Sequence, residues 1–73
     1  MYLITEEWYE GEAYNVTAYG QKTTEQIDDI TNQMEKYSPY DYCDYCELKT
    51  PEEYEHKLDV LKGLGSVIKF AND

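Results

Sequence analysis

The chain has 73 residues and carries 16 Asp or Glu against six Lys and no Arg, which gives a formal net charge of -10. A chain of this length is expected to form one acidic interaction domain, residues 1–73, with a modest core. The charge disfavours direct binding to DNA, RNA or anionic membranes, because their phosphates would be repelled. It favours a basic partner or simple solubility.

The chain has no apolar run long enough for a membrane span. Near its start, Glu6 and Glu7 occupy the place where a signal peptide would have its apolar region. We therefore expect a soluble cytoplasmic protein, monomeric or homodimeric. Its two cysteines should then be reduced thiols, or part of a metal site, rather than a structural disulfide.

Residues 2–20 are predicted to form a β-hairpin. The segments 2–9 and 13–19 are rich in aromatic and β-branched residues, and they flank a short turn that contains Gly11. Neither face of the two strands is cleanly apolar, so the register stays open. The residues expected to face the core are Ile4, Val16 and Ala18.

Two capped helices are predicted after the hairpin. Thr23 and Gln26 are spaced as a capping box, and Pro39 would end the first helix. Thr50 and Pro51 open the second helix, which a glycine at 63 or 65 would end. The expected apolar stripes are Ile27, Ile30, Met34 and Tyr37 on the first helix and Tyr54, Leu58, Leu61 and Leu64 on the second.

A short final strand is predicted over residues 66–71, where Val67, Ile68 and Phe70 are apolar. It must return to the hairpin, since an isolated hairpin is only marginally stable. The predicted fold is therefore a small single α+β domain in the order β-hairpin–α–α–β. Its sheet would have three mostly antiparallel strands with two helices on one face.

The segment 38–47 lies between the two helices and is predicted to be a loop, because no apolar periodicity runs through it. It holds both cysteines, Cys43 and Cys46, at a spacing that can supply two of the four ligands of a zinc ion. The remaining ligands would come from His56, a carboxylate or a second copy of the chain. Three interpretations stay open: two ordinary thiols, a metal site with zinc as cofactor, or a redox pair. The first of these implies no cofactor.

An enzymatic role is not indicated. The chain shows no nucleophile elbow, no phosphate-binding glycine loop and no calcium-loop spacing. His56 is expected to be a solvated residue on the outer face of its helix, because general acid–base catalysis needs a positioned partner and a pocket. We therefore predict no catalytic residues.

Tyrosine is the second unusual feature, with nine residues in the chain. An exposed tyrosine offers a rigid contact area at low entropic cost, which is typical of binding surfaces. Tyrosine also serves to cover the edges of a small domain that is short of leucine and valine. The five that are hardest to bury together are Tyr9, Tyr19, Tyr40, Tyr42 and Tyr45.

This combination of small size, high negative charge and absence of arginine resembles the small phage-encoded DNA-mimic inhibitors. That class includes some anti-CRISPR and anti-restriction proteins and inhibitors of uracil-DNA glycosylase. The resemblance extends over the whole composition and to no sequence motif, and its members share no common fold. It implies that clustered carboxylates imitate nucleic-acid phosphates and fill a groove lined by lysine and arginine.

The leading prediction is a non-enzymatic inhibitor or regulator that binds the basic groove of a DNA- or RNA-handling protein. The alternatives are a small metal-binding module that uses Cys43 and Cys46, and a general protein–protein adaptor. Carboxylates would pair with basic side chains of the partner, and tyrosine rings would anchor the contact. The predicted contact residues are Glu6, Glu7, Tyr9, Glu10, Glu12, Asp41, Tyr42, Asp44, Tyr45, Glu47, Glu52, Glu55 and Asp59.

Overall fold

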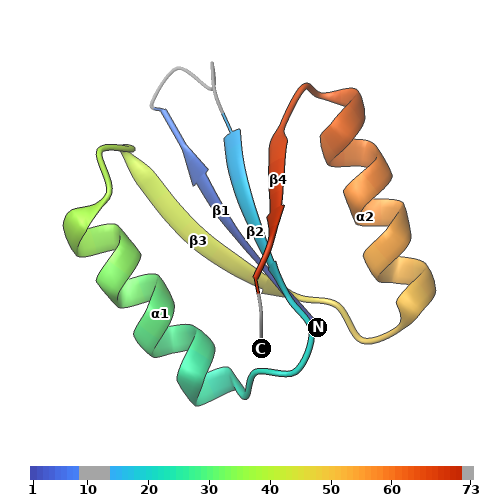
Figure 1. The fold of residues 1–73 in the computed structure, drawn as a ribbon, viewed down its shortest axis with the longest axis horizontal. Helices are drawn as coiled ribbons and strands as arrows, with labels where there is room; N and C mark the ends of the chain where they lie inside the picture. The colour runs from blue at the N-terminus through green and yellow to red at the C-terminus, as the bar shows by residue number, and fades with distance from the viewer. Residues whose placement is uncertain (9–13, 72–73) are drawn as a thin grey trace.

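The computed structural model describes residues 1–8 and 14–71. Within this part of the chain the elements follow in the order β1 (Tyr2–Glu7), β2 (Tyr14–Tyr19), α1 (Thr24–Tyr37), β3 (Tyr42–Glu47), α2 (Pro51–Gly63) and β4 (Val67–Phe70). Figure 1 shows the two helices on either side of the strands. The protein is thus a small α+β domain, as the sequence predicts.

The sheet has four strands in the order β3-β1-β2-β4 and is mixed. β1 pairs antiparallel with both β2 and β3, whereas β2 pairs parallel with β4. The predicted number of three strands is therefore wrong by one, whereas two of the three pairings are antiparallel, in line with the predicted mostly antiparallel sheet. The missing strand is β3, which occupies residues 42–47 of the segment predicted to be a loop.

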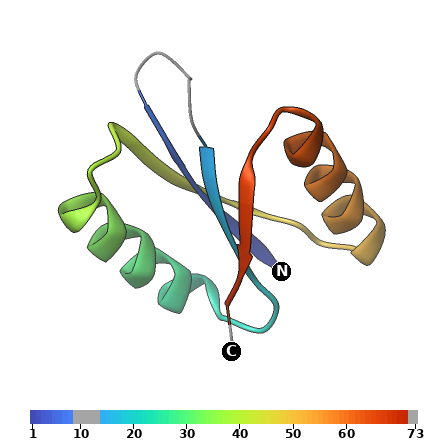
Figure 2. The same ribbon diagram turned by 45° about the horizontal axis from the view of Figure 1, so that its top comes forward.

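The helices lie on opposite faces of the sheet, in contrast to the prediction that both cover one face (Figures 1 and 2). α1 packs over Tyr2 and Ile4, and α2 packs over Leu3, Val16 and Ala18. The helices lie on opposite faces because β3 makes each of them a crossover between parallel strands. The chain crosses the sheet from β2 to β3 through α1 and returns from β3 to β4 through α2. Two crossovers of the same hand that run in opposite directions place their helices on opposite faces.

β1 is central and is buried on both faces. Tyr2, Leu3 and Ile4 are consecutive buried residues, so side chains that point to either face are covered. This explains why neither face of the predicted hairpin is cleanly apolar. Ile4, Val16 and Ala18 are buried as expected, but Ile4 belongs to the α1 side and the other two to the α2 side.

The helix ends follow the predicted capping signals. Thr23 Oγ1 accepts from the Gln26 backbone N–H at 3.2 Å, and Gln26 Oε1 accepts from the Thr23 N–H at 2.9 Å. Thr50 Oγ1 likewise accepts from the Glu53 N–H at 3.1 Å, with Pro51 in the first turn. Gly65 has a φ of 86°, the left-handed conformation that the chain needs after α2.

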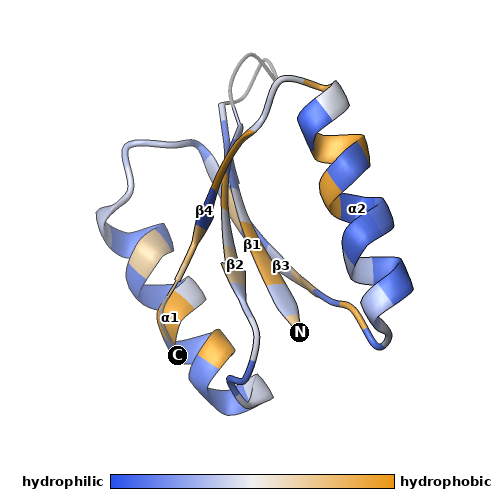
Figure 3. Ribbon diagram, turned by 45° about the vertical axis from the view of Figure 1, so that its right-hand side comes forward, coloured by the Kyte–Doolittle hydropathy of each residue, from blue (hydrophilic) through white to orange (hydrophobic). Residues whose placement is uncertain are grey.

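The ends of both apolar stripes differ from the prediction. Tyr37 is 73% exposed at the end of α1, and Leu64 is 67% exposed just after α2. Figure 3 shows the apolar positions of α2 on the side that faces the sheet and hydrophilic positions on its outer side. The side chains of Leu58 and Leu61 are buried against the sheet. Burial of each such side chain contributes about 1.5–3 kcal/mol.

Candidate functional site

Carboxylates from three elements surround the edge strand β3. Cys43 shows this most directly: partial burial, followed by the nearby charges of Glu6, Glu35 and Asp44, raises the pKa of its thiol to about 11. Each of these carboxylates disfavours a second negative charge at that sulfur. The Cys43 side chain therefore stays a neutral thiol at pH 7, so it is not an activated nucleophile.

Tyr45, on the same face of β3 as Cys43, is also surrounded by negative charge. Its hydroxyl is hydrogen-bonded to the carboxylate of Asp28 on α1, and this bond is the largest cause of the raised pKa of Tyr45. Burial and the charge of Asp44 raise it further. α1 thus contributes acid to β3, which the sequence analysis did not anticipate.

Asp28 and Glu35 lie seven residues apart, on one flank of α1. That spacing is visible in the sequence, but it carries meaning only once β3 is known to pack beside this flank. We call the acidic residues that border β3 on both faces of the sheet, together with Tyr42, the acidic edge. It consists of Glu6 on β1, Asp28 and Glu35 on α1, and Asp41, Tyr42, Asp44 and Glu47 in and before β3.

Tyr2 holds one end of the acidic edge. Its buried ring lies on the α1 side of the sheet, and its hydroxyl donates to Glu47 Oε2 at 2.8 Å. The Thr24 hydroxyl lies 2.5 Å from the same oxygen of Tyr2. The ring also makes an edge contact with Tyr45, with centroids 6.1 Å apart. Glu47 is therefore held in a defined position rather than on a freely rotating side chain.

The segment before β3 is fixed to the hairpin by polar contacts. Ser38 Oγ donates to Glu6 Oε2 at 2.5 Å and accepts from the Tyr40 backbone N–H at 3.1 Å. Asn15 Nδ2 donates to the Tyr40 hydroxyl at 2.6 Å. The Tyr40 ring stacks on Trp8 at a centroid distance of 4.5 Å. Glu6 and Tyr40 therefore organise this end of the site as well as contributing to its surface.

The predicted contact residues do not form one continuous surface. Glu6 and Glu7 are neighbours on a strand, so they point to opposite faces of the sheet. In β3, Tyr45 and Glu47 lie on the α1 side, whereas Tyr42 and Asp44 lie on the α2 side. Asp41 precedes β3 and is exposed. Tyr9, Glu10 and Glu12 lie outside the described residues.

The carboxylates of α2 form a separate patch. They are exposed on the outer side of a helix whose inner side packs on the opposite sheet face from α1. They therefore do not extend the acidic edge directly. This patch contains Glu52, Glu55 and Asp59.

Three of the tyrosines expected to be hard to bury are less exposed than the sequence suggests. Tyr19, Tyr40 and Tyr45 are half-buried, and Tyr42 is 47% exposed. The half-buried rings lie on the α1 side of the sheet or against Trp8, so they contribute to packing.

The two cysteines are free thiols that point to opposite faces of the sheet. Cys43 packs beside Ile4 and α1, and Cys46 packs against the core around Leu3. Side chains three positions apart on a strand cannot converge on one ion while the strand stays paired. Within residues 1–8 and 14–71, no group of three or more His, Cys, Asp or Glu side chains is arranged to hold a metal ion.

No family model matches the chain, and neither a curated protein nor a solved structure matches it. Among the described residues, neither helix is long and apolar enough to cross a membrane. The acidic edge is therefore the feature of the molecule that bears most directly on function. What this surface can do chemically is to attract and bind cationic groups.

Proposed function

We propose that the protein is a non-enzymatic inhibitor or regulator that binds the basic groove of a DNA- or RNA-handling protein. The observation that carries the proposal is the convergence of carboxylates from β1, α1 and β3 on the acidic edge. Among settings in which such a protein acts, we favour phage anti-defence, such as anti-CRISPR or anti-restriction activity. This choice rests on the small size, the net charge of -10 and the absence of arginine.

The spacing of the carboxylates supports this mode of binding. A strand rises about 3.3 Å per residue, so Asp44 and Glu47 are roughly 10 Å apart along β3 and point to opposite faces of the sheet. Glu47 shares the α1 side with Asp28 and Glu35, which lie along one flank of α1. Negative charges spread in this way on a folded scaffold are suited to the lysine and arginine side chains that line a nucleic-acid groove.

Binding should depend steeply on salt, because the contact is between opposite charges at an exposed surface. The test uses a panel of purified basic nucleases, polymerases and restriction or CRISPR effectors. Affinity is measured by biolayer interferometry from low to high sodium chloride, with duplex DNA as competitor. The proposal is supported by a partner whose binding to this protein weakens as salt increases and is displaced by duplex DNA. Affinity that is flat across the salt series contradicts it.

Matched charge variants locate the contact. The double variant Glu35→Gln with Asp41→Asn removes two charges from the acidic edge. The control variant, Glu25→Gln with Asp29→Asn, removes two charges from the outermost side of α1. Both double variants therefore have the same net charge. We expect the first pair to weaken binding about tenfold or more and the second to change it little. Equal losses would indicate a response to total charge rather than to this surface.

A further inference from the structure

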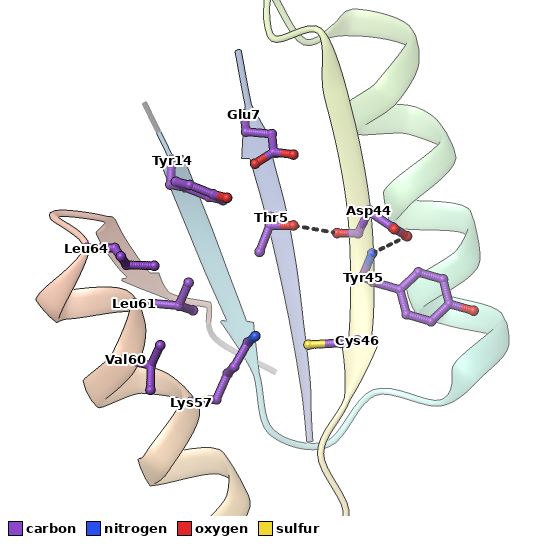
Figure 4. Close-up of a pocket in the computed structure, with 10 residues that line it drawn as sticks. All are labelled: Thr5, Glu7, Tyr14, Asp44, Tyr45, Cys46, Lys57, Val60, Leu61 and Leu64. Atoms are coloured by element: carbon purple, nitrogen blue, oxygen red, sulfur yellow. Dashed lines mark hydrogen bonds between the residues drawn. The ribbon is translucent and has the colours of Figure 1, made fainter. Parts of the chain in front are cut away.

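An open groove lies between the sheet and the C-terminal end of α2, on the face opposite to α1 (Figure 4). Its volume is about 300 Å³. One wall is apolar and consists of Val60 and Leu61 on α2 and Leu64 just after it. The other wall comes from the strands and is polar. It includes Thr5, Glu7, Tyr14 and Asp44.

The groove forms where the apolar contacts between α2 and the sheet end. Leu58 and Leu61 meet apolar strand residues and are buried. Beyond these contacts the strand residues are Thr5 and Glu7, which are polar. Leu64 therefore finds no apolar strand residue to pack against. Leu64 stays 67% exposed for this reason.

The two walls together specify an amphipathic cation. An anionic ligand would be repelled by Glu7 and Asp44. A purely apolar ligand would cover the negative charge of Glu7 without neutralising it, which is costly. A long side chain with an apolar stem and a cationic head satisfies both walls. The volume is at the lower limit of ligand pockets, about 300 Å³, which suits one such side chain.

Arginine matches the polar wall better than lysine. The Glu7 carboxylate has two acceptor oxygens, and a guanidinium presents several donors in a planar fork that can pair with both. The Tyr14 ring stands beside Glu7 and offers a face for a guanidinium. A hydrogen bond to the Glu7 carboxylate raises the pKa of Tyr14, so this hydroxyl stays protonated and neutral at pH 7.

Lys57 is the cationic side chain that lines the groove. In Figure 4 it lies at the end near Cys46, whereas Glu7 and Tyr14 lie at the other end. The end that carries Glu7 is therefore the one with negative charge available to a ligand.

We propose that this groove binds one arginine side chain of the basic partner, with the guanidinium at the Glu7 carboxylate beside Tyr14 and the stem along Val60 and Leu64. This inference rests on the proposed function for the nature of the partner. It adds a defined specificity site on the α2 face of the sheet, separate from the α1 flank of the acidic edge.

The test uses blocked arginine, N-acetyl-arginine amide, titrated into the full-length protein labelled at methyl groups. We expect saturable chemical-shift changes confined to Thr5, Val60, Leu61 and Leu64. The isosteric neutral probe, N-acetyl-citrulline amide, should bind about tenfold more weakly, because it lacks the charge-assisted hydrogen bonds. Equal binding of the two probes, or shifts spread over all acidic surfaces, would overturn the inference.

Variants separate this site from general charge attraction. Glu7→Gln retains an acceptor for Tyr14 and should weaken the arginine probe about tenfold. Leu64→Ser should weaken it without changing net charge, and this exposed position should tolerate the substitution. The control Asp29→Asn removes the same charge from α1 and should have little effect. An equal loss with Asp29→Asn would overturn the inference.

The outcomes for the two proposals are distinguishable. Salt-sensitive binding of a nucleic-acid-binding protein with no change in the groove signals would overturn the arginine site and leave the proposed function standing. Arginine-probe binding in the groove, with no such protein bound, would do the reverse.

Discussion

Three tyrosine hydroxyls in the described part of the chain donate hydrogen bonds to carboxylates. Tyr2 donates to Glu47, and the hydroxyls of Tyr45 and Tyr14 are hydrogen-bonded to Asp28 and Glu7. A tyrosine can bury its ring while its hydroxyl reaches an exposed acceptor. In a chain with 16 acids and no arginine, these donors hold negative side chains in place without cancelling their charge.

Substitution of Tyr2 tests this role directly. Tyr2→Phe keeps the buried ring but removes the hydrogen bonds to Glu47 and Thr24. We expect the free energy of unfolding to fall by about 1–2 kcal/mol, as measured by urea denaturation. The control Tyr37→Phe changes an exposed tyrosine and should cost less than about 0.5 kcal/mol. Equal effects of the two substitutions would contradict a structural role for the Tyr2 hydroxyl.

The reactivity of Cys43 should show the acidic surroundings of β3. Burial and the charges of Glu6, Glu35 and Asp44 raise the pKa of its thiol from 9.0 to about 11. Alkylation of Cys43 by iodoacetamide, followed by peptide mapping, should therefore rise with pH to a midpoint near 11 in the folded protein. In urea the midpoint should return towards 9.0. A folded-state midpoint at or below the urea value would contradict the expectation.

The same shift affects stability in a defined direction. The folded state holds the Cys43 proton more tightly than the unfolded state does, since its folded pKa is the higher one. The resulting contribution to stability is fully present below pH 9 and is lost as pH rises towards 11. Cys43→Ser should remove this part of the pH dependence.

At the scale of elements, β3 is an edge strand whose charged residues disfavour pairing with another chain. A strand edge presents backbone groups that can pair with another chain, and charged side chains counteract such pairing. In β3, Asp44 Oδ1 accepts from the Tyr45 backbone N–H at 2.8 Å, and Asp41 and Glu47 add charge at its ends. The residues that form the acidic edge therefore also oppose edge-to-edge aggregation.

The N-terminus of α2 depends on Thr50. Its hydroxyl accepts from the Glu53 N–H, and Glu53 Oε2 accepts from the Lys49 N–H at 3.1 Å. Thr50→Ala should lower the free energy of unfolding by about 1 kcal/mol, as measured by chemical denaturation. Thr50→Ser retains the hydroxyl and should restore most of this loss. If serine is no better than alanine, the cap does not stabilise α2.

At the scale of the whole molecule, a net charge of -10 works against compaction. The like charges repel one another, and this repulsion is largest in the compact state. Salt screens exposed charges over about 10 Å at 0.1 M. We therefore expect the melting temperature to rise when sodium chloride is increased from 0.02 to about 0.3 M, as followed by circular dichroism. Choline chloride at equal ionic strength controls for a specific sodium effect. A melting temperature that falls with salt would contradict this expectation.

The local features of the fold were accessible from the sequence because short-range chemistry determines them. Thr23 with Gln26, Thr50 with Pro51, and Gly65 mark helix ends by hydrogen bonding and backbone geometry within a few residues. β3 was not accessible in this way. Its residues alternate between the two sheet faces, but Asp44 and the two cysteines give no clear apolar pattern.

Missing β3 led to the other errors. Without a predicted strand between the helices, there was no basis for choosing between both helices on one face of the sheet and one helix on each face. The same omission made Cys43 and Cys46 look like neighbours in a loop. The groove beside Leu64 was equally hidden, although Val60 lies outside the apolar stripe of α2 and is a weak signal of a second apolar contact.

By itself the sequence determined the charge, the α+β class and the capped helices. These are properties of composition and of contacts between residues close in the chain. Only the tertiary structure decided which carboxylates act together. Strand pairing brings β3 beside β1, and a crossover brings α1 beside β3. Charge clusters and grooves are made by residues distant in sequence, and their positions depend on those long-range pairings.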